Sequence, residues 1–369
     1  MTLTPVLLLA IPGFVFLTVI CLFAWQYHQT RGLAYFGRPQ SERFLFKKRV
    51  ARIGRWLRPL FRLLAFREPG PNQFTVRRDG IHVPANVCNK RSLSDAVNYQ
   101  PDRADIFVVT QMKCGTTWMQ QIVYEILMRG KGDLGDGGNG HLMAISPWLE
   151  SFVGPEINEA PLLGEAQHRI LKTHLPAQLC PASADAKFLC VTRHPASCFA
   201  SCRDFFRSAA GEFTPPDRAL LDWFCSDEMW WGSWPSHVAG WYERSRSSSN
   251  VLLIHFEEMK RNLSGVVRSV AAFLGVECSE EEIALITSKC EFESMKKNEE
   301  RFEMMPPGFF STGEAFLKSG AIDRHSSLDP AERKRIEEFC QAAMSRGNFS
   351  YDDYLAGAGL KPQSGRKGQ

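Results

Sequence analysis

The chain lacks several signatures of common protein classes. Its 11 cysteines include no Cys-x-x-Cys pair, and no spacing of cysteine and histidine fits a zinc site. The net charge is only +4, too small to indicate a nucleic-acid-binding surface. There is also no internal repeat. We therefore expect reduced thiols, no metal ion and no nucleic-acid partner.

A Walker A loop, in which a lysine follows the second glycine of G-x-x-x-x-G-K-[ST], is also missing. Instead, apolar residues at 106–110 predict a buried strand, and Gly115 with Thr116 or Thr117 predicts a tight turn into a helix. The start of such a helix binds anions, because its backbone N–H groups lack partners and its dipole is positive. Lys113 precedes the turn and would supply the charge that a metal ion supplies in kinases. Taken alone, the stretch also fits a plain turn with a surface lysine.

No charged residue occurs between positions 2 and 25, where Leu, Val, Ile and Phe predominate. A helix of that length spans a hydrocarbon layer of roughly 30 Å, and the run lacks the layout of a cleaved signal peptide. Basic residues greatly outnumber acidic ones at positions 31–67, and positive charge stays on the cytoplasmic side. The sequence thus predicts a transmembrane anchor at residues 1–26 and a single-pass membrane protein whose main domain faces the cytoplasm.

Apolar residues recur every three or four positions from Phe46 to Leu64, between the basic residues. They predict a basic amphipathic juxtamembrane segment within residues 27–72, lying on an anionic membrane surface. Packing of this helix on the globular domain is the alternative. We expect the main domain at residues 73–355 and a disordered tail at residues 356–369.

Three further apolar runs, at 169–176, 187–192 and 251–256, predict buried strands. Lys172 and His174 lie two positions apart, so on a strand their side chains share one face and offer a cation and a titratable base. Strands that alternate with helices predict an α/β fold with a central parallel sheet and helices on both faces. A lone histidine at a strand end is more often structural, and that is the alternative for His174.

Taken together and in order, five blocks of the chain resemble the P-loop-like sulfotransferases of the cytosolic type. These enzymes transfer a sulfuryl group from 3′-phosphoadenosine 5′-phosphosulfate (PAPS) to an alcohol, phenol or amine. The resemblance runs from about residue 81 to residue 298. The blocks are KCGTTW at 113–118, KTHLP at 172–176, RHP at 193–195 with Ser201, WGSWPSHVAGW at 231–241 and FEEMK at 256–260.

The resemblance implies a role for each matching residue. His174 would be the general base, and Lys113 and Lys172 would stabilise charge on the transferring group and the leaving phosphate. No metal ion would take part. The nucleotide would be held by Lys113, Cys114, Gly115, Thr116, Thr117 and Trp118 in the loop, by Arg193 and Ser201 at the 3′-phosphate, by Phe256, Cys290 and Phe292 near the base, and by Lys318, Ser319 and Gly320 toward the carboxyl terminus.

The chain also departs from the family. Phe256 stands where the family usually has tyrosine, and Cys290 stands near a usual threonine or serine. The family's carboxyl-terminal Arg-Lys-Gly survives only as Lys-Ser-Gly at 318–320, which predicts a weaker grip on the 3′-phosphate. The resemblance implies a sulfotransferase acting on a lipophilic alcohol, phenol or lipid. The alternatives are a nucleotide-binding membrane scaffold without turnover and, less favoured, a P-loop nucleotide kinase, which would depend on magnesium.

Overall fold

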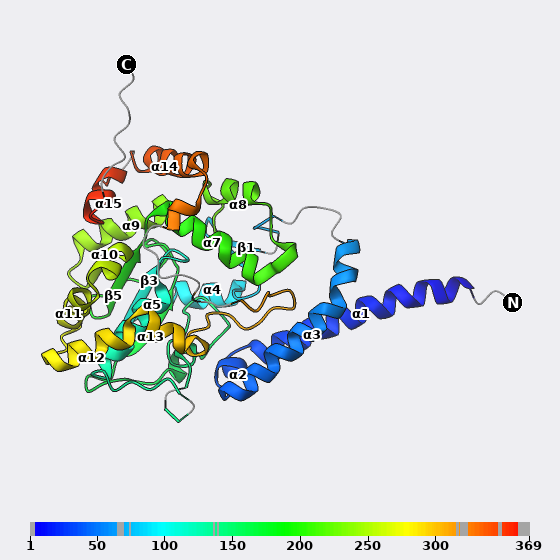
Figure 1. The fold of residues 1–369 in the computed structure, drawn as a ribbon, viewed down its shortest axis with the longest axis horizontal. Coiled ribbons are helices and arrows are strands. Elements are labelled where there is room, and N and C mark those ends of the chain that lie inside the picture. The colour runs from blue at the N-terminus through cyan, green and yellow to red at the C-terminus, as the bar shows by residue number, and fades with distance from the viewer. Residues whose placement is uncertain are drawn as a thin grey trace, which may run out of the picture.

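The computed structural model describes residues 4–64, 70–73, 75–135, 137–138, 140–314, 317, 324–345 and 349–360, with the backbone alone for residues 4–12 and 64 (Figure 1). At its centre lies a parallel sheet of four strands in the order β4-β3-β5-β6. The strands are β3 (Asp105–Thr110), β4 (Arg169–Thr173), β5 (Lys187–Thr192) and β6 (Val251–His255). The predicted strands and the parallel sheet are therefore confirmed, although β4 and β6 end earlier than the predicted apolar runs at 169–176 and 251–256.

Each strand is covered on both faces. In β3, Phe107 and Val109 belong to one hydrophobic cluster, and Ile106 and Val108 belong to another on the opposite face. The first cluster includes residues of α7 (Pro195–Ala210), α9 (Trp234–Ser247) and α14 (Pro330–Met344), and the second includes residues of α5 (Thr116–Leu127), α11 (Leu263–Leu274) and α12 (Glu280–Cys290). Because apolar side chains point to both faces, the strands read as continuous apolar runs.

The remaining elements are short. They are α2 (Leu33–Phe36), β1 (Thr75–Arg78), β2 (Ile81–Pro84), α4 (Lys90–Val97), α6 (Leu142–Ile145), η1 (Ile157–Glu159), η2 (Gly211–Phe213), α8 (Asp217–Phe224), α10 (Phe256–Arg261), α13 (Phe292–Lys297), η3 (Glu299–Arg301), η4 (Arg324–Ser327) and α15 (Tyr351–Gly357). Strands β1 and β2 pair as an antiparallel hairpin. The division of the chain into domains stays a prediction, and residues 361–369 of the expected tail lie outside the described residues.

The strand order places a ligand site at one edge of the sheet. Strand β3 lies between β4 and β5, which follow it in the chain on opposite sides. Connections that leave neighbouring strands in opposite directions open a crevice at their carboxyl ends, where open α/β sheets bind ligands. Thr110, Thr173 and Thr192 end these three strands, so the residues that follow them meet at this crevice.

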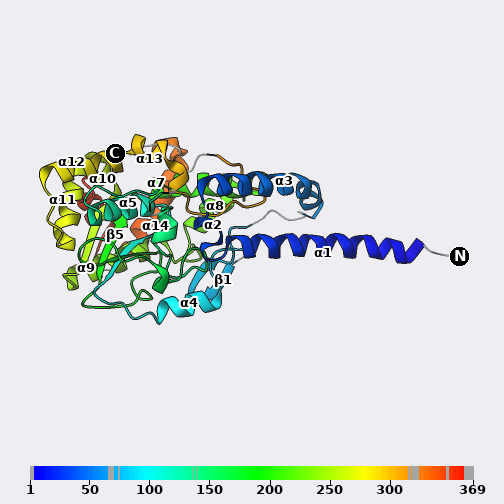
Figure 2. The same ribbon diagram turned by 90° about the horizontal axis from the view of Figure 1, so that it is seen from below.

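The two long amino-terminal helices, α1 (Thr4–Thr30) and α3 (Gln40–Leu64), lie side by side, and α1 extends away from the sheet (Figure 1 and Figure 2). Within the described part of the chain, no helix combines the length and the apolar character needed to cross a membrane. The predicted single-pass membrane localisation is therefore wrong, and the predicted transmembrane anchor is unsupported. Apolar side chains near the end of α1 pack on protein instead: Trp25 contacts Phe46, and Tyr27 contacts Phe152.

Helix α3 turns its apolar face toward the main body. Phe46, Val50 and Leu57 are buried in the same hydrophobic cluster as Phe107 of β3. Gly54 marks the closest approach, because a Cβ atom at this position would lie 1.7 Å from the carbonyl oxygen of Phe309. The amphipathic spacing thus corresponds to a helix packed on the globular body.

Candidate active site

The loop between β3 and α5 has the shape of an anion-binding turn. Lys113 and Gly115 both adopt positive φ angles, 65° and 107°. A Cβ atom on Gly115 would approach Phe256 to 2.8 Å, so the position requires glycine. The Thr116 hydroxyl lies 2.7 Å from the hydroxyl of Thr110, which ties the loop back to the end of β3. Gly115, Thr116 and Thr117 at the start of α5 line the cavity at this crevice.

His174 lies just beyond β4 and is buried between two indole rings. Its Nδ1 atom lies 2.8 Å from the carbonyl oxygen of Thr110. Because a carbonyl only accepts hydrogen bonds, Nδ1 carries the proton and Nε2 keeps its lone pair. Burial, followed by the charge of Lys172, holds the pKa of His174 well below its ordinary value. The ring centroids of Trp148 and Trp231 lie 5.2 and 4.8 Å away.

The buried Lys172 and the half-buried Lys113 line the same cavity as His174. Burial lowers the pKa of Lys172 to about 7 and the pKa of Lys113 to about 8. The Nζ atom of Lys172 lies 3.5 Å from the ring centroid of Trp148, and that of Lys113 lies 5.1 Å from the ring centroid of Phe205. Cations held without water around them attract an anionic ligand strongly.

Arg193 follows β5 and reaches across to the loop between β3 and α5. Its Nη1 donates to the carbonyl oxygen of Lys113 at 3.2 Å, and its guanidinium lies 4.2 Å from the ring centroid of Phe256. Among the described residues, the buried Nε of Arg193 and the buried hydroxyl of Thr117 have no hydrogen-bond partner. Unpaired buried donors are costly unless a ligand uses them. Ser201 on α7 lines the same cavity.

Aromatic residues form another part of the cavity wall, near the start of α5. Trp118 donates its indole N–H to the carbonyl oxygen of Cys290 at 2.7 Å, and its ring lies edge-on to Phe256 at 5.5 Å. The Lys260 amine lies 5.5 Å from the Trp118 centroid and 5.7 Å from the Phe292 centroid. Trp118 and Phe292 therefore lie near the same amine, and both line the cavity.

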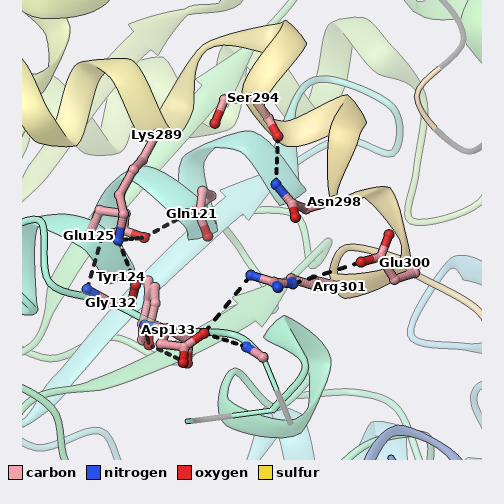
Figure 3. Close-up of polar contacts among 11 residues, drawn as sticks. Gln121, Tyr124, Glu125, Gly132, Asp133, Lys289, Ser294, Asn298, Glu300 and Arg301 are labelled. Carbon is pink, nitrogen blue, oxygen red and sulfur yellow. Dashed lines mark hydrogen bonds and ion pairs between the residues drawn. The ribbon is translucent and has the colours of Figure 1, made fainter. Parts of the chain in front are cut away.

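A polar network holds this aromatic end in place (Figure 3). The Lys289 amine lies 3.2 Å from a carboxylate oxygen of the buried Glu125, which also accepts from the Gln121 side chain and the Gly132 N–H. Burial raises the pKa of Glu125 above its ordinary value, and Lys289 opposes that shift. The bridge joins α5 to the end of α12, directly beside Cys290.

The structure brings together most of the predicted site residues. The side chains or backbone of eleven of them line one cavity of about 1650 Å³: Lys113, Gly115, Thr116, Thr117, Trp118, Lys172, His174, Arg193, Ser201, Phe256 and Phe292. Cys114 does not line it, and its sulfur lies 3.7 Å from that of Cys198. Cys290 meets Trp118 through its carbonyl group alone. Lys318, Ser319 and Gly320 lie outside the described residues.

Sequence reasoning missed Glu150 and Trp148, which lie on the loop before β4. The fully buried Glu150 carboxylate accepts from the His174 N–H and from the Thr173 hydroxyl, each at 2.8 Å. In the sequence, the feature that could have indicated Glu150 is that it is the one carboxylate within the largely apolar stretch 142–153. Glu150 fixes the backbone that carries His174.

Comparison with known proteins identifies the family. The sulfotransferase domain model matches residues 103–348. Human sulfotransferase 2B1 is 31% identical over 277 residues, covering 70% of this chain and 74% of the relative. The 3-alpha-hydroxysteroid sulfotransferase of Cavia porcellus is 29% identical, covering 65% of this chain and 84% of the relative.

Solved structures show the same fold. Mouse sulfotransferase SULT7A1, complexed with PAP, aligns with a TM-score of 0.59 and 22% identity, covering 74% of this chain and 96% of that one. Retinol dehydratase in a complex with retinol and PAP aligns with a TM-score of 0.56 and 20% identity, covering 71% and 88% of the two chains. With the match of the domain model over most of its length, the chain belongs to the PAPS-dependent sulfotransferase family.

Proposed function

We propose that this sulfotransferase moves the sulfuryl group of PAPS to the hydroxyl group of a lipophilic acceptor, by in-line attack with His174 as general base. The observation that carries the proposal is the hydrogen bond from His174 Nδ1 to the Thr110 carbonyl oxygen. It directs the basic Nε2 away from that carbonyl, in a ring that borders the same cavity as Lys113 and Lys172.

The chemical step follows from the protonation states. His174 is neutral near pH 7 because its pKa is lowered, so Nε2 accepts the acceptor's hydroxyl proton as the oxygen attacks sulfur. The bond between sulfur and the phosphate oxygen breaks, and 3′-phosphoadenosine 5′-phosphate leaves. Lys113 and Lys172 stabilise the negative charge that moves onto the leaving phosphate.

We base the proposed nucleotide site on buried hydrogen-bond donors that have no partner among the described residues. The amino end of α5 and the Thr117 hydroxyl would hold the 5′-phosphate, and Arg193 with Ser201 would hold the 3′-phosphate. The unpaired Arg193 Nε supports this assignment, because guanidinium groups bind phosphate through paired N–H donors. The adenine would stack between Trp118 and Phe292.

The lipophilic acceptor is supported by the cavity walls and by the relatives. Trp148, Trp231, Phe205 and Phe206 line the space around and beyond His174. Among the relatives, one is named a 3-alpha-hydroxysteroid sulfotransferase, and one solved structure holds androsterone with PAP. Apolar walls of this kind favour an alcohol or phenol with a large apolar body.

The test combines binding with turnover. Calorimetric titration of the full chain with 3′-phosphoadenosine 5′-phosphate should show binding, and titration with ATP and magnesium should show none. Transfer from radiolabelled PAPS to a phenol should survive a chelator and should be lost in His174→Ala. His168→Ala is the matched control, because His168 lies just before β4 and does not line the cavity. Binding of ATP with magnesium alone would indicate a kinase and refute the proposal.

A further inference from the structure

Helix α1 lies outside the matched family domain but borders the same cavity as the catalytic residues. Its lining residues are Phe23, Gln26, Tyr27 and Thr30. Their spacing of three, four and seven positions places them on one face of the helix. A single helical stripe therefore faces the cavity.

Helix α3 contributes a second stripe with the same spacing, made of Phe44, Lys47, Lys48 and Ala51. Its two amines are already engaged. Lys47 forms an ion pair with Glu303, and the Lys48 amine lies 4.1 Å from the ring centroid of Phe44. The hydrocarbon stems of both lysines then cover apolar surface. The two stripes together form what we call the outer wall.

The outer wall is fixed to the main body. Gln26 donates to the carbonyl oxygen of Pro307 at 2.8 Å, and Phe23 lies edge-on to Phe309 with ring centroids 5.1 Å apart. Arg62 of α3 forms an ion pair with Glu212 at 2.5 Å. Helices held at several points along their length give a cavity wall a defined position.

Aromatic side chains connect the outer wall to His174. Phe205, Phe206 and Phe213, from α7 and η2, line the cavity between the two regions, together with Phe309 and Phe310. The Phe213 and Phe310 rings are 4.6 Å apart, and Phe310 also contacts Phe61 of α3 at 4.9 Å. An apolar path therefore runs from the base to the amino-terminal helices.

The outer wall borders the part of the cavity that lies away from the proposed nucleotide residues. The cavity holds about 1650 Å³, and pockets for a single small molecule hold roughly 300–1,000 Å³, so the nucleotide and an extended acceptor fit in it together. We propose that α1 and α3 bind the distal end of the acceptor, so that the substrate is a long apolar alcohol or phenol whose tail reaches the outer wall. The inference rests on the proposed function and adds the class of acceptor and the helices that select it.

The test uses the full chain and a series of 4-alkylphenols with increasing chain length. In the unmodified protein, kcat/KM should rise by about fourfold for each methylene that enters the cavity and then level off. Ala51→Trp fills the outer wall without removing a packed side chain, because Ala51 is exposed toward the cavity. We expect the rise to level off at a shorter chain in this variant, and at a longer chain in Phe44→Ala.

The matched control is Leu45→Trp. Leu45 lies on the same helix and is 64% exposed, but it does not line the cavity, so its chain-length profile should follow that of the unmodified protein. Calorimetric binding of 3′-phosphoadenosine 5′-phosphate shows that each variant is folded. The same levelling-off length in all four proteins would overturn the inference while leaving the proposed function intact. Absence of transfer even to phenol, without bisphosphate binding, would instead refute the proposed function.

Discussion

Replacing Lys289 by methionine tests whether the buried Glu125 carboxylate fixes the aromatic end of the cavity, where we propose that adenine binds. Breaking a buried ion pair costs roughly 3–5 kcal/mol, whereas exposed pairs contribute at most about 1 kcal/mol. The Glu125 side chain is 3% exposed, but that of Lys289 is 33% exposed. We therefore expect the free energy of unfolding of Lys289→Met to fall by about 2 kcal/mol at pH 7, between these limits.

The loss should depend on pH in a defined direction. Burial raises the pKa of Glu125 above its ordinary value, and the Lys289 charge opposes this rise. Without Lys289 the pKa rises further. A carboxyl group whose pKa is raised in the folded state contributes most to the free energy of unfolding below its ordinary pKa. That contribution is lost as the pH rises through the folded-state pKa. The difference in the free energy of unfolding between Lys289→Met and the unmodified protein should therefore shrink as the pH falls toward 4.5.

Urea unfolding across this pH range and calorimetric binding of 3′-phosphoadenosine 5′-phosphate would measure both effects. Bisphosphate affinity should fall, because α12 carries the Cys290 carbonyl that holds Trp118. Adding Glu125→Gln to Lys289→Met should restore most of the stability by removing the unpaired charge. Lys334→Met, which breaks the exposed pair with Glu338, is the control and should change little. A pH-independent loss of stability would refute the reasoning.

Three further outcomes are expected. His174→Ala should lower kcat by about 10²–10⁴-fold with bisphosphate affinity retained, as single-turnover kinetics and calorimetry would show, and unchanged turnover would remove His174 from the mechanism. Bisphosphate binding near pH 8 should take up protons, because burial lowers the pKa of Lys172 to about 7 and that of Lys113 to about 8, and bound phosphate raises both. The heat of binding should therefore change with the ionisation enthalpy of the buffer, and a constant heat would contradict this. Gly54→Ala should lower the melting temperature, because its methyl group would overlap the Phe309 carbonyl oxygen, and an unchanged melting temperature would show that the two segments separate freely.

The sheet and most of the site could be predicted because they depend on local rules. Apolar runs mark the strands, and side chains two positions apart, such as Lys172 and His174, share a face. Parallel strands bring their carboxyl ends to one edge, so Lys113 and Arg193 meet although they lie far apart in the sequence. The turn at Gly115 followed from the same local reasoning.

The sequence could not predict which surface an apolar helix contacts. An apolar run such as that of α1 has the same pattern whether it faces lipid or protein. The contacts of Phe23, Trp25 and Tyr27 show that the carboxyl-terminal part of the helix packs on the chain. Glu150 and the bridge between Glu125 and Lys289 were missed for a related reason. Their partners lie 23 or more residues away in the sequence, and no periodic pattern indicates such pairs.

Thr110 joins two parts of the site that are usually considered separately. Its carbonyl oxygen accepts the His174 Nδ1 proton, and its hydroxyl contacts that of Thr116 at the start of α5. A proton buried in this way exchanges slowly with water, so it should give a resolved downfield resonance in a proton NMR spectrum. Because the loop that touches Thr110 is the one expected to bind the donor, this resonance would serve as an intrinsic reporter of nucleotide occupancy, read without a label and without turnover.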